Sequence, residues 1–401
     1  MTSAAEGWID VLPKDWYLIP SKAAFAERRE PNRANDVHLT PSQTHGVLPQ
    51  AEYMAKTGNS VVQNIQGQDN MKHVEPDDFI IHLRSFQGGI ERSRYSGKVS
   101  AAYTVLKPSD RVVPSYFRWL LKSDGYIQEL RTTTNQLRDG QSIKFAHFAK
   151  VQLPCPPRSE QRAIADYLDR ETARIDTLIE EQQRLIDLLH ERRDAEADAL
   201  LGSPVQARHT TVKRALRPLQ RPAVGGLGVV TAFRDGVVTL RSNRREDGFT
   251  FSNTEHGYQE IRPGDLVFHA LDGFAGAVGV SDSQGNATPV YHVCEATVGD
   301  DLAYVARLLR YLGRSGFLAT QAPNVRERSV DFRNWAMFGR LPLALPPVGD
   351  QRRIAAHLDE QNAKTNTLIA ESEQFVELAR ERRAVLIAAA VTGQIDVREM
   401  V

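Results

Sequence analysis

The segment Ser159–Asp169 reads SEQRAIADYLD, and Gly349–Asp359, 190 residues later, reads GDQRRIAAHLD. Each copy follows closely after a Pro-Pro pair. At the same offset, residues 153–193 and 343–383 are identical at 18 of 41 positions without a gap. A match of this length indicates an internal repeat. We therefore predict a tandem duplication.

Each repeated segment is predicted to form one long helix. No glycine or proline interrupts residues 161–201 or 351–392, and Gly202 and Gly393 follow the two runs at matching places. A helix of about 40 residues at ~1.5 Å per residue is ~60 Å long. Because so polar an isolated helix needs a partner, we expect the two copies to pack side by side.

The start and the packing seam of these helices can be predicted from residue types and spacing. Ser159 and Gly349, each followed by an acidic residue, are the expected N-caps. Polar residues interrupt both seams, which favours a spacer that also presents a surface to other subunits over a plain structural stalk. Apolar residues at 3–4 spacing are expected to face the other helix. These are Ile164, Leu168, Ile175, Leu178, Leu185 and Leu189 in the first copy, and Ile354, Leu358, Leu368 and Phe375 in the second.

The rest of the chain is predicted to form two mixed α/β blocks, so the expected fold class is α+β. Apolar, β-branched runs near glycine mark strands, as in residues 235–242 (DGVVTLRS) and 276–283 (GAVGVSDS). Residues 74–83 (VEPDDFIIHL) also resemble 261–270 (IRPGDLVFHA), which indicates corresponding strands in the two blocks. The expected domains are residues 1–152 (first block), 153–205 (first helical spacer), 206–342 (second block) and 343–401 (second spacer and C-terminal tail).

Composition predicts a soluble protein of the cytoplasm. Hydrophobic residues make up 41% and charged residues 25% of the chain, both ordinary for globular domains. We find neither a secretory signal nor an apolar window of the roughly 18 residues that a membrane span needs. Cys155 and Cys294 have no neighbours at metal-ligand spacing. They are expected to be buried or idle thiols, and no metal is expected.

The net charge of zero hides a segregation of charge along the chain. Residues 1–150 and 206–342 have net charges of +3 and +4, whereas residues 151–205 and 343–401 have −5 and −2. Two mildly basic blocks thus alternate with two acidic helical segments. A neutral total partitioned in this way is compatible with a polyanionic partner.

Motifs for catalysis are missing from the sequence. It contains no GxxxxGK[ST] phosphate loop, no GxGxxG after a strand, no GxSxG elbow and no HExxH. Asp77, Asp78 and Glu91 could be combined into a nuclease-like carboxylate cluster, but the residues after Glu91 lack the lysine of such a site. We expect carboxylates on a solvated surface here, and a chain that is not itself an enzyme.

Side chains suited to nucleic-acid recognition are present instead. Arginine and lysine can bind phosphates or guanine, and asparagine and glutamine can pair with adenine. Such residues cluster at corresponding places in the two blocks, which makes them candidate DNA contacts. His269 closes an apolar run and can equally be interpreted as a framework residue. The candidates are Arg84, Ser85, Gln87, Arg92, Arg94, Lys98, Asn135, Gln136, Arg138, Gln141 and Lys144 in the first block, and Arg241, Asn243, Arg244, Arg245, His269, Asp272, Asn324, Arg326, Arg328 and Ser329 in the second.

Four segments together resemble a known family. They are LPKDW (12–16), PCPPRSEQRAIADYLD (154–169), ALPPVGDQRRIAAHLD (344–359) and ERRAVLIAAAVTGQID (381–396). This arrangement resembles the specificity subunit of type I DNA restriction–modification systems. The resemblance extends over nearly the whole chain. It departs where the first copy ends in LLGSPV and the second has VTGQID.

The resemblance implies a function and a set of partners. Each block would be a target-recognition domain that reads one half of a split site in double-stranded DNA. The two long helices would pack as an antiparallel coiled coil, relate the blocks by a pseudo-twofold axis and set the distance between the halves. Two methyltransferase subunits would dock on the helical regions, and restriction and translocase subunits would join the larger complex. The methyl donor, metal and ATP would belong to those partners, so no cofactor is expected on this chain.

Because the two blocks differ in their polar residues, we predict an asymmetric bipartite target. Two alternatives remain open: a stand-alone DNA-binding regulator and a coiled-coil scaffold without a nucleic-acid role. The regulator would bind DNA tightly without other subunits. The scaffold would associate in a salt-insensitive way, whereas affinity that rests on phosphate contacts falls steeply as salt rises.

Overall fold

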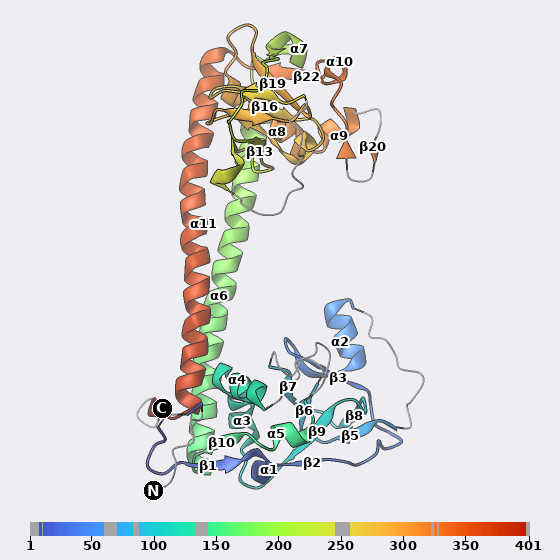
Figure 1. Ribbon diagram of the computed structural model, residues 1–401, viewed down its shortest axis with the longest axis vertical. Coiled ribbons are helices and arrows are strands. Elements are labelled where there is room, and N and C mark those ends of the chain that lie inside the picture. Colours follow the sequence, from blue (N-terminus) through green and yellow to red (C-terminus); the bar gives the residue numbers. More distant parts are fainter. Residues whose placement is uncertain are drawn as a thin grey trace. The chain divides into compact units, whose positions relative to one another are not determined.

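The structure is a computed structural model of the 401-residue chain. It describes residues 8–9, 11–59, 70–82, 88–133, 143–244, 257–321, 325–326 and 329–397. The chain forms two compact units, the first made of residues 1–183 and 374–401 and the second of residues 184–373. Each unit combines a small α/β block with a stretch of both long helices (Figure 1).

The α/β block of the first unit contains ten strands and five short helices among the described residues. The helices are α1 (Ser21–Ala24), α2 (Gln50–Thr57), α3 (Pro114–Leu120), α4 (Asp124–Thr132) and α5 (Phe145–Phe148). The strands are β1 (Tyr17–Pro20), β2 (Phe25–Glu27), β3 (Leu39–Ser42), β4 (Gly46–Pro49), β5 (Lys72–Val74), β6 (Phe79–Ile81), β7 (Ile90–Arg92), β8 (Gly97–Val99), β9 (Thr104–Pro108) and β10 (Gln152–Cys155).

The main sheet of the first block has the strand order β2-β9-β6-β7, and all its neighbours are antiparallel. The central strand β6 reads FII and is buried along its whole length, as expected for a strand covered on both faces. Phe25 of β2 makes edge-to-face contacts with Phe79, Phe117 and Phe148, with ring centroids 5.3–5.7 Å apart. These aromatic contacts join the sheet to α3 and α5 in one core.

The α/β block of the second unit contains twelve strands, four α-helices and two 3-10 helices among the described residues. Its helices are α7 (Val212–Ala215), α8 (Leu302–Arg314), α9 (Phe317–Gln321) and α10 (Trp335–Phe338), with 3-10 helices η3 (Arg241–Asn243) and η4 (Gly273–Ala275). Its strands are β11 (Arg208–Thr211), β12 (Leu216–Pro218), β13 (Val230–Ala232), β14 (Val238–Leu240), β15 (Gln259–Ile261), β16 (Leu266–His269), β17 (Val278–Val280), β18 (Gly285–Ala287), β19 (Tyr291–Ala296), β20 (Val325–Arg326), β21 (Ser329–Val330) and β22 (Pro342–Leu345).

The two blocks have matching strand orders. The main sheet of the second is β12-β19-β16-β17, with the same sequence of neighbours as β2-β9-β6-β7. Three paired ribbons also correspond: β1-β10, β3-β4 and β5-β8 in the first block and β11-β22, β13-β14 and β15-β18 in the second. The second block has a further ribbon, β20-β21. The pairs β1-β10 and β11-β22 bring the first strand of each block beside its last one.

The predicted mixed α/β composition and the two long helices are confirmed: α6 spans Arg158–Leu201 and α11 spans Val348–Val391. The predicted N-caps are wrong, because each helix starts before Ser159 or Gly349. The N–H groups of Gln161 and Gln351 donate to the carbonyls of Pro157 and Pro347 at 2.9 and 3.0 Å. The second proline of each Pro-Pro pair therefore accepts the first helical hydrogen bond, which is the role of an N-cap residue.

The two long helices run antiparallel within each unit. In the first unit, Leu168 shares a core with Val391, and Asp176, two turns further along α6, forms an ion pair with Arg383. In the second unit, Ile186 and Leu189 pack on Ile369. Further along α6, Glu196 bonds to His357, and Leu201 shares a core with Leu358.

The structure corrects the predicted packing seam at four of its ten residues. Leu178, Leu185, Leu368 and Phe375 are each at least 40% exposed. In their place α11 buries Ile369, Ser372 and Val376, and α6 buries Thr172 and Ile186. The prediction assumed that large apolar side chains face the other helix. Small polar residues take several of these places; Thr172, for example, satisfies its hydroxyl by donating to the carbonyl of Leu168.

Candidate nucleic-acid interface

A buried glutamine attaches the first block to α6. The Oε1 atom of Gln161 accepts the N–H of Val113, the residue before α3, at 2.8 Å. Its Nε2 atom donates to the carbonyls of Arg111 and Pro156 at 3.0 and 2.9 Å. Gln161 is fully buried, so its amide has no access to water. It therefore fixes the N-terminus of α3 on the long helix.

Gln351 makes the corresponding contacts in the second unit. Its Oε1 atom accepts the N–H of Asp301, the N-cap of α8, at 2.8 Å. Its Nε2 atom donates to the carbonyl of Pro346 at 2.8 Å and to Oδ1 of Asp300 at 2.9 Å. The glutamine shared by the two repeated segments thus has the same structural role in both units.

The aspartate that ends each repeated segment makes a second attachment. Asp169 of α6 forms an ion pair with Arg118 of α3 and accepts a hydrogen bond from Nε1 of Trp119 at 2.8 Å. Asp359 of α11 forms an ion pair with Arg307 of α8. Together, the glutamine and the aspartate explain why the two segments resemble each other: both orient a block helix on a long helix.

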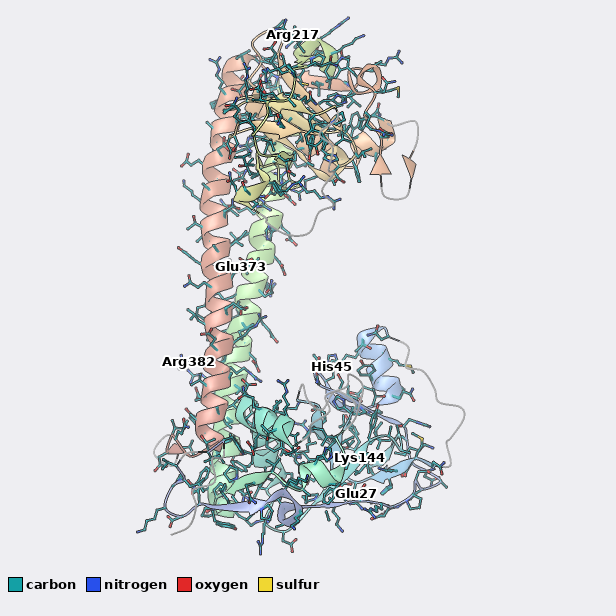
Figure 2. The ribbon with its side chains drawn as sticks, viewed as in Figure 1. Glu27, His45, Lys144, Arg217, Glu373 and Arg382 are labelled. Carbon is teal, nitrogen blue, oxygen red and sulfur yellow. The ribbon has the colours of Figure 1, made fainter. Side chains whose placement is uncertain are left out.

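The described candidates of the first block lie on the β7–β8 connection and at the start of α5. Arg92 ends β7 and donates from Nε to Oδ1 of Asp77 at 2.8 Å. Arg94 is exposed and forms no ion pair with the described residues. Lys98 is partly buried on β8. Lys144, the residue before α5, is exposed on the same block (Figure 2).

The three carboxylates considered for a nuclease-like cluster each have a cationic partner. Asp77 pairs with an arginine, as described above, and Asp78 accepts hydrogen bonds of 2.6 and 3.1 Å from Arg28. Glu91 pairs with Lys122, which follows α3, at 2.7 Å. Burial raises the pKa of Glu91 to about 7, against the opposing effect of Lys122. Asp78 and Glu91 are buried, so the expectation of a solvated surface is wrong for them, whereas the side chain of Asp77 is partly exposed. The pairing of all three with cations is that of a structural framework.

Three described candidates of the second block, Arg241, Asn243 and Arg244, follow β14, and Arg244 contacts the turn between β13 and β14. Arg244 forms an ion pair with Asp235 of this turn, and its guanidinium lies 5.0 Å from the ring centroid of Phe233. Arg241 and Asn243 lie on the adjoining helix η3. The sequence placed these three candidates together, and the structure adds the acidic and aromatic residues that orient Arg244.

Asp272 contacts the same turn, and His269 contacts the backbone of Asp272. Asp272 forms an ion pair with Arg234 at 3.0 Å. His269 accepts N–H hydrogen bonds on Nδ1 from Leu271 and Asp272 at 3.2 and 3.0 Å, and burial lowers its pKa. It is therefore a neutral imidazole that holds the end of β16, which agrees with its interpretation as a framework residue.

Several candidates cannot be placed as side chains. Arg326 and Ser329 pair through their backbones in the β20–β21 ribbon. The remaining candidates lie outside the described residues: Arg84, Ser85, Gln87, Asn135, Gln136, Arg138, Gln141, Arg245, Asn324 and Arg328.

A cluster of arginines on the second unit was missed by the sequence reading. Arg307, Arg310 and Arg314 of α8 and Arg193 of α6 line one hollow. The spacing of three and four residues along α8 places its three arginines on one face. That signal was present in RLLRYLGR, but only the fold shows that the face meets Arg193.

Comparison with protein families supports the predicted resemblance. Residues 34–187 match the model of a family described as "Type I restriction modification DNA specificity domain". A search of curated protein sequences found no match.

Two solved structures have a similar fold. The crystal structure of the HsdS subunit from Thermoanaerobacter tengcongensis is similar with a TM-score of 0.58 at 13% identity, covering 96% of this chain and 98% of that one. A chain from a study of complex assembly and conformational transition of the type I R-M system has a TM-score of 0.66 at 13% identity, covering 96% and 100%. The resemblance to type I specificity subunits is therefore confirmed by a domain match and by fold. None of the described helices has the length and apolarity to cross a membrane.

Proposed function

We propose that this chain is the DNA sequence-recognition subunit of a type I restriction–modification complex. It binds an asymmetric bipartite target in double-stranded DNA and carries two methyltransferase subunits, which restriction and translocase subunits join. The chain itself is not catalytic, and its place is in the cytoplasm with the DNA. The proposed recognition domains are residues 1–152 and 206–342, and the proposed helical spacers are residues 153–205 and 343–401.

The observation that carries this proposal is a shared framework with different polar surfaces. The sheets of the two blocks have the same strand order, and Gln161 and Gln351 attach both blocks in the same way. The candidate contacts nevertheless differ. Arg94 lies on the β7–β8 connection and Lys98 on β8, whereas residues 278–287, from β17 to β18, contain no arginine or lysine. Two similar readers with different side chains suit a target with two different halves.

The helices have a second part in the proposal, as a spacer between the readers. We infer that α6 and α11 pack along their length as an antiparallel coiled coil and relate the blocks by a pseudo-twofold axis. The antiparallel contacts within each unit support this. Each helix has 44 residues, or ~66 Å at ~1.5 Å per residue. This length suits two half-sites about one helical turn, ~34 Å, or somewhat more apart.

The decisive experiment is co-expression with candidate methyltransferase subunits, followed by purification and genome-wide mapping of methylated bases. The proposal expects a stable complex and methylation at one interrupted, non-palindromic sequence. A palindromic site would contradict the asymmetric target. Tight, salt-sensitive DNA binding by the chain alone, with no effect of added subunits, would favour a stand-alone regulator. Salt-insensitive association without DNA binding would favour a scaffold.

Exposed leucines on the long helices test the docking role. Leu178 and Leu368 are 44% and 48% exposed, so Leu178→Asp combined with Leu368→Asp is expected to change the free energy of unfolding by less than about 0.5 kcal/mol. The same double variant is expected to abolish co-purification of the methyltransferase subunits, since it places charge in an apolar contact. The exposed pair Glu180→Asp with Glu373→Asp is the control. A double variant that assembles normally and methylates the same site would rule out these surfaces.

A further inference from the structure

The two blocks treat a partly buried cation in different ways. In the first unit, Lys122 comes nine residues after Val113, the N-cap of α3, and pairs with Glu91 of β7. In the second unit, Arg310 comes nine residues after Asp301, the N-cap of α8. By this count, Arg310 takes the place of Lys122.

The carboxylate partner is missing at the corresponding strand position. Glu91 is opposite Ile80 of β6, and Gly279 is opposite Val267 of β16, so Gly279 takes the place of Glu91. A Cβ atom built on Gly279 would lie only 2.1 Å from the carbonyl oxygen of Gly236. No side chain fits there, so the second block cannot supply the acid that the first block has.

Arg310 is left without a counterion among the described residues. It forms no ion pair or hydrogen bond with them, and its Nε atom is buried and unpartnered. Burial, followed by the charges of Arg314, Arg193 and Arg307, lowers the pKa of Arg310 to about 10, while Asp235 opposes the shift. A partly buried cation without a direct ion pair is destabilising by itself.

The side chain of Arg310 is held in place by tight backbone contacts. A Cβ atom built on Gly236 would lie 3.0 Å from Cδ of Arg310, and one built on Gly276 would lie 3.5 Å from its Cγ. Both glycines have positive φ, 92° and 98°, which glycine adopts without strain. The stem of Arg310 therefore packs directly on main chain, and its guanidinium has less freedom than that of an ordinary surface arginine.

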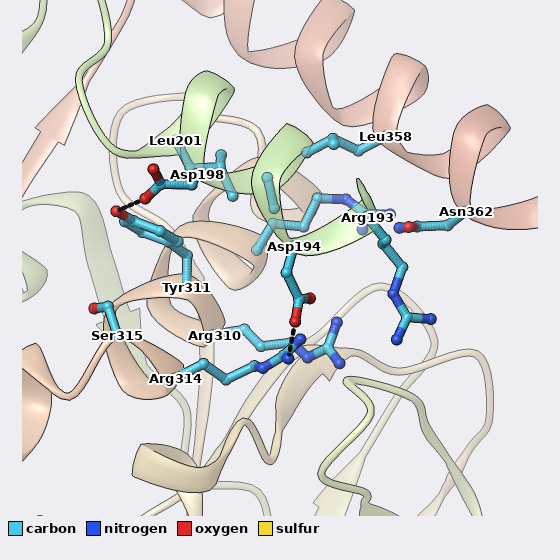
Figure 3. A pocket seen from close by; sticks show the side chains of 12 residues that line it. Arg193, Asp194, Asp198, Leu201, Arg310, Tyr311, Arg314, Ser315, Leu358 and Asn362 are labelled. Carbon is cyan, nitrogen blue, oxygen red and sulfur yellow. Dashed lines mark hydrogen bonds and ion pairs between the residues drawn. The ribbon is translucent and has the colours of Figure 1, made fainter. Parts of the chain in front are cut away.

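The guanidinium of Arg310 reaches a hollow of about 260 Å³ between α6 and α8. Figure 3 shows Arg193, Arg310 and Arg314 extending into the same space. The two acids of the lining are already engaged: Asp194 pairs with Arg314, and Asp198 accepts a hydrogen bond from a tyrosine. The lining thus contains four arginines and two aspartates, an excess of positive charge in a partly desolvated place.

We propose that this hollow is a phosphate-binding site in which Arg310 makes the central contact and Arg193 and Arg307 lie beside it. A phosphate group accepts paired hydrogen bonds from guanidinium groups and supplies the negative charge that the fold omits. This inference rests on the proposed function where it identifies the phosphate as one of the DNA backbone. Inorganic phosphate or a nucleotide phosphate has the same chemistry, and the experiment separates these sources.

The first arm measures the melting temperature of the full chain in sodium phosphate and in sodium chloride at equal ionic strength. Phosphate is expected to raise the melting temperature of the wild type and to have no such effect on Arg310→Gln. In chloride, Arg310→Gln is expected to melt at or above the wild-type temperature, because it removes an uncompensated buried charge. This result also establishes that the variant is folded. Arg310→Lys keeps the charge without the planar fork and should retain only part of the phosphate effect.

The second arm measures the affinity of the same proteins for a DNA duplex over a range of salt concentrations. Arg310→Gln is expected to weaken binding about tenfold, equally for every duplex sequence, and to reduce the slope of log affinity against log salt by about 1. The control is Arg217→Gln on β12 (Figure 2), which removes an arginine that does not line the hollow. It should leave affinity and slope unchanged.

The outcomes separate the site from its ligand and from the proposed function. Loss in the DNA arm identifies a backbone phosphate. A phosphate effect that depends on Arg310, with unchanged DNA binding, identifies a free phosphate. If the wild type binds no duplex but keeps that phosphate effect, the proposed function fails and the site stands. If phosphate has no effect and Arg310→Gln binds DNA like the wild type, the site is overturned and the function is untouched.

Discussion

The two α/β blocks are alike where they attach to the long helices and unlike where they face solvent. Each attaches through a buried glutamine and an aspartate about two turns beyond it. These are Gln161 and Asp169 in the first unit and Gln351 and Asp359 in the second. The two aspartates are partly exposed. The amides of Gln161 and Gln351 are buried and paired, so a change there leaves a partner unsatisfied. Exposed residues such as Arg94 carry no such constraint. Divergence of the loops therefore costs the framework little.

The largest effect is expected from removing either glutamine. Gln161→Leu would leave the N–H of Val113 and two carbonyls buried without partners, and Gln351→Leu would do the same to the N–H of Asp301. We expect each to lower the free energy of unfolding by about 3 kcal/mol, measured by urea denaturation. Gln183→Leu, at an exposed position of α6, is the control and should change it little.

If the two glutamine variants lost clearly different free energies of unfolding, the two attachments would not be equivalent. That would mean that one block depends on other contacts for its place on the long helix. Hydrogen exchange at the amides of Val113 and Asp301 in each variant would show which attachment has opened.

The next effect distinguishes the blocks by pH. Burial raises the pKa of Glu91 from 4.5 to about 7, so the folded state holds this proton more tightly than the unfolded state. Between about pH 4.5 and pH 7 the carboxyl is ionised in the unfolded state but still protonated in the folded state. The free energy of unfolding should therefore fall by up to roughly 3 kcal/mol as pH rises through this range, and then level off. Urea denaturation across this range, on wild type and Glu91→Gln, measures the contribution.

Glu91→Gln should flatten that part of the pH profile. The second block has Gly279 in the place of Glu91, so it has no equivalent titration. If the wild type and Glu91→Gln change in parallel with pH, the carboxyl is not responsible for the dependence.

The smallest effect sharpens the comparison between the two aspartates. Asp169 receives an ion pair and the Nε1–H of Trp119, whereas Asp359 receives only the ion pair with Arg307 among the described residues. These contacts are partly exposed, so Asp169→Ala is expected to cost about 1 kcal/mol and Asp359→Ala about 0.5 kcal/mol. Thermal melting should resolve the order, with Asp187→Ala, exposed on α6, as the control. A larger cost for Asp359→Ala would contradict the assignment of Trp119.

The repeat was enough to predict both long helices, because the absence of glycine and proline over some 40 residues is a local property of the chain. The seam was harder, since burial of Thr172 and Ser372 in place of Leu178 and Phe375 depends on how closely two particular helices approach. In the candidate site, too, residue type could be predicted from the sequence and contacts between elements could not. Residue type identified Arg244 as a candidate, but its pairing with Asp235 required the turn between β13 and β14.

Arg310 illustrates what lay beyond the sequence. Arg310 has no ion pair with the described residues because the strand position that holds Glu91 in the first block holds Gly279 in the second. Gly279 lies 31 residues before Arg310 in the sequence. That relation depends on strand register and on the carbonyl of Gly236, neither of which is encoded in local spacing. Comparing the blocks by position in the fold was necessary to find it.

The pairing of β1 with β10 and of β11 with β22 has a consequence for how such a chain changes. The first and last strands of each block are antiparallel neighbours. The two ends of a block therefore lie side by side. A foreign block that ends in the same strand pair could be spliced in without altering the helices. Under the proposed function, exchange of one whole block would change one half of the DNA target in a single step.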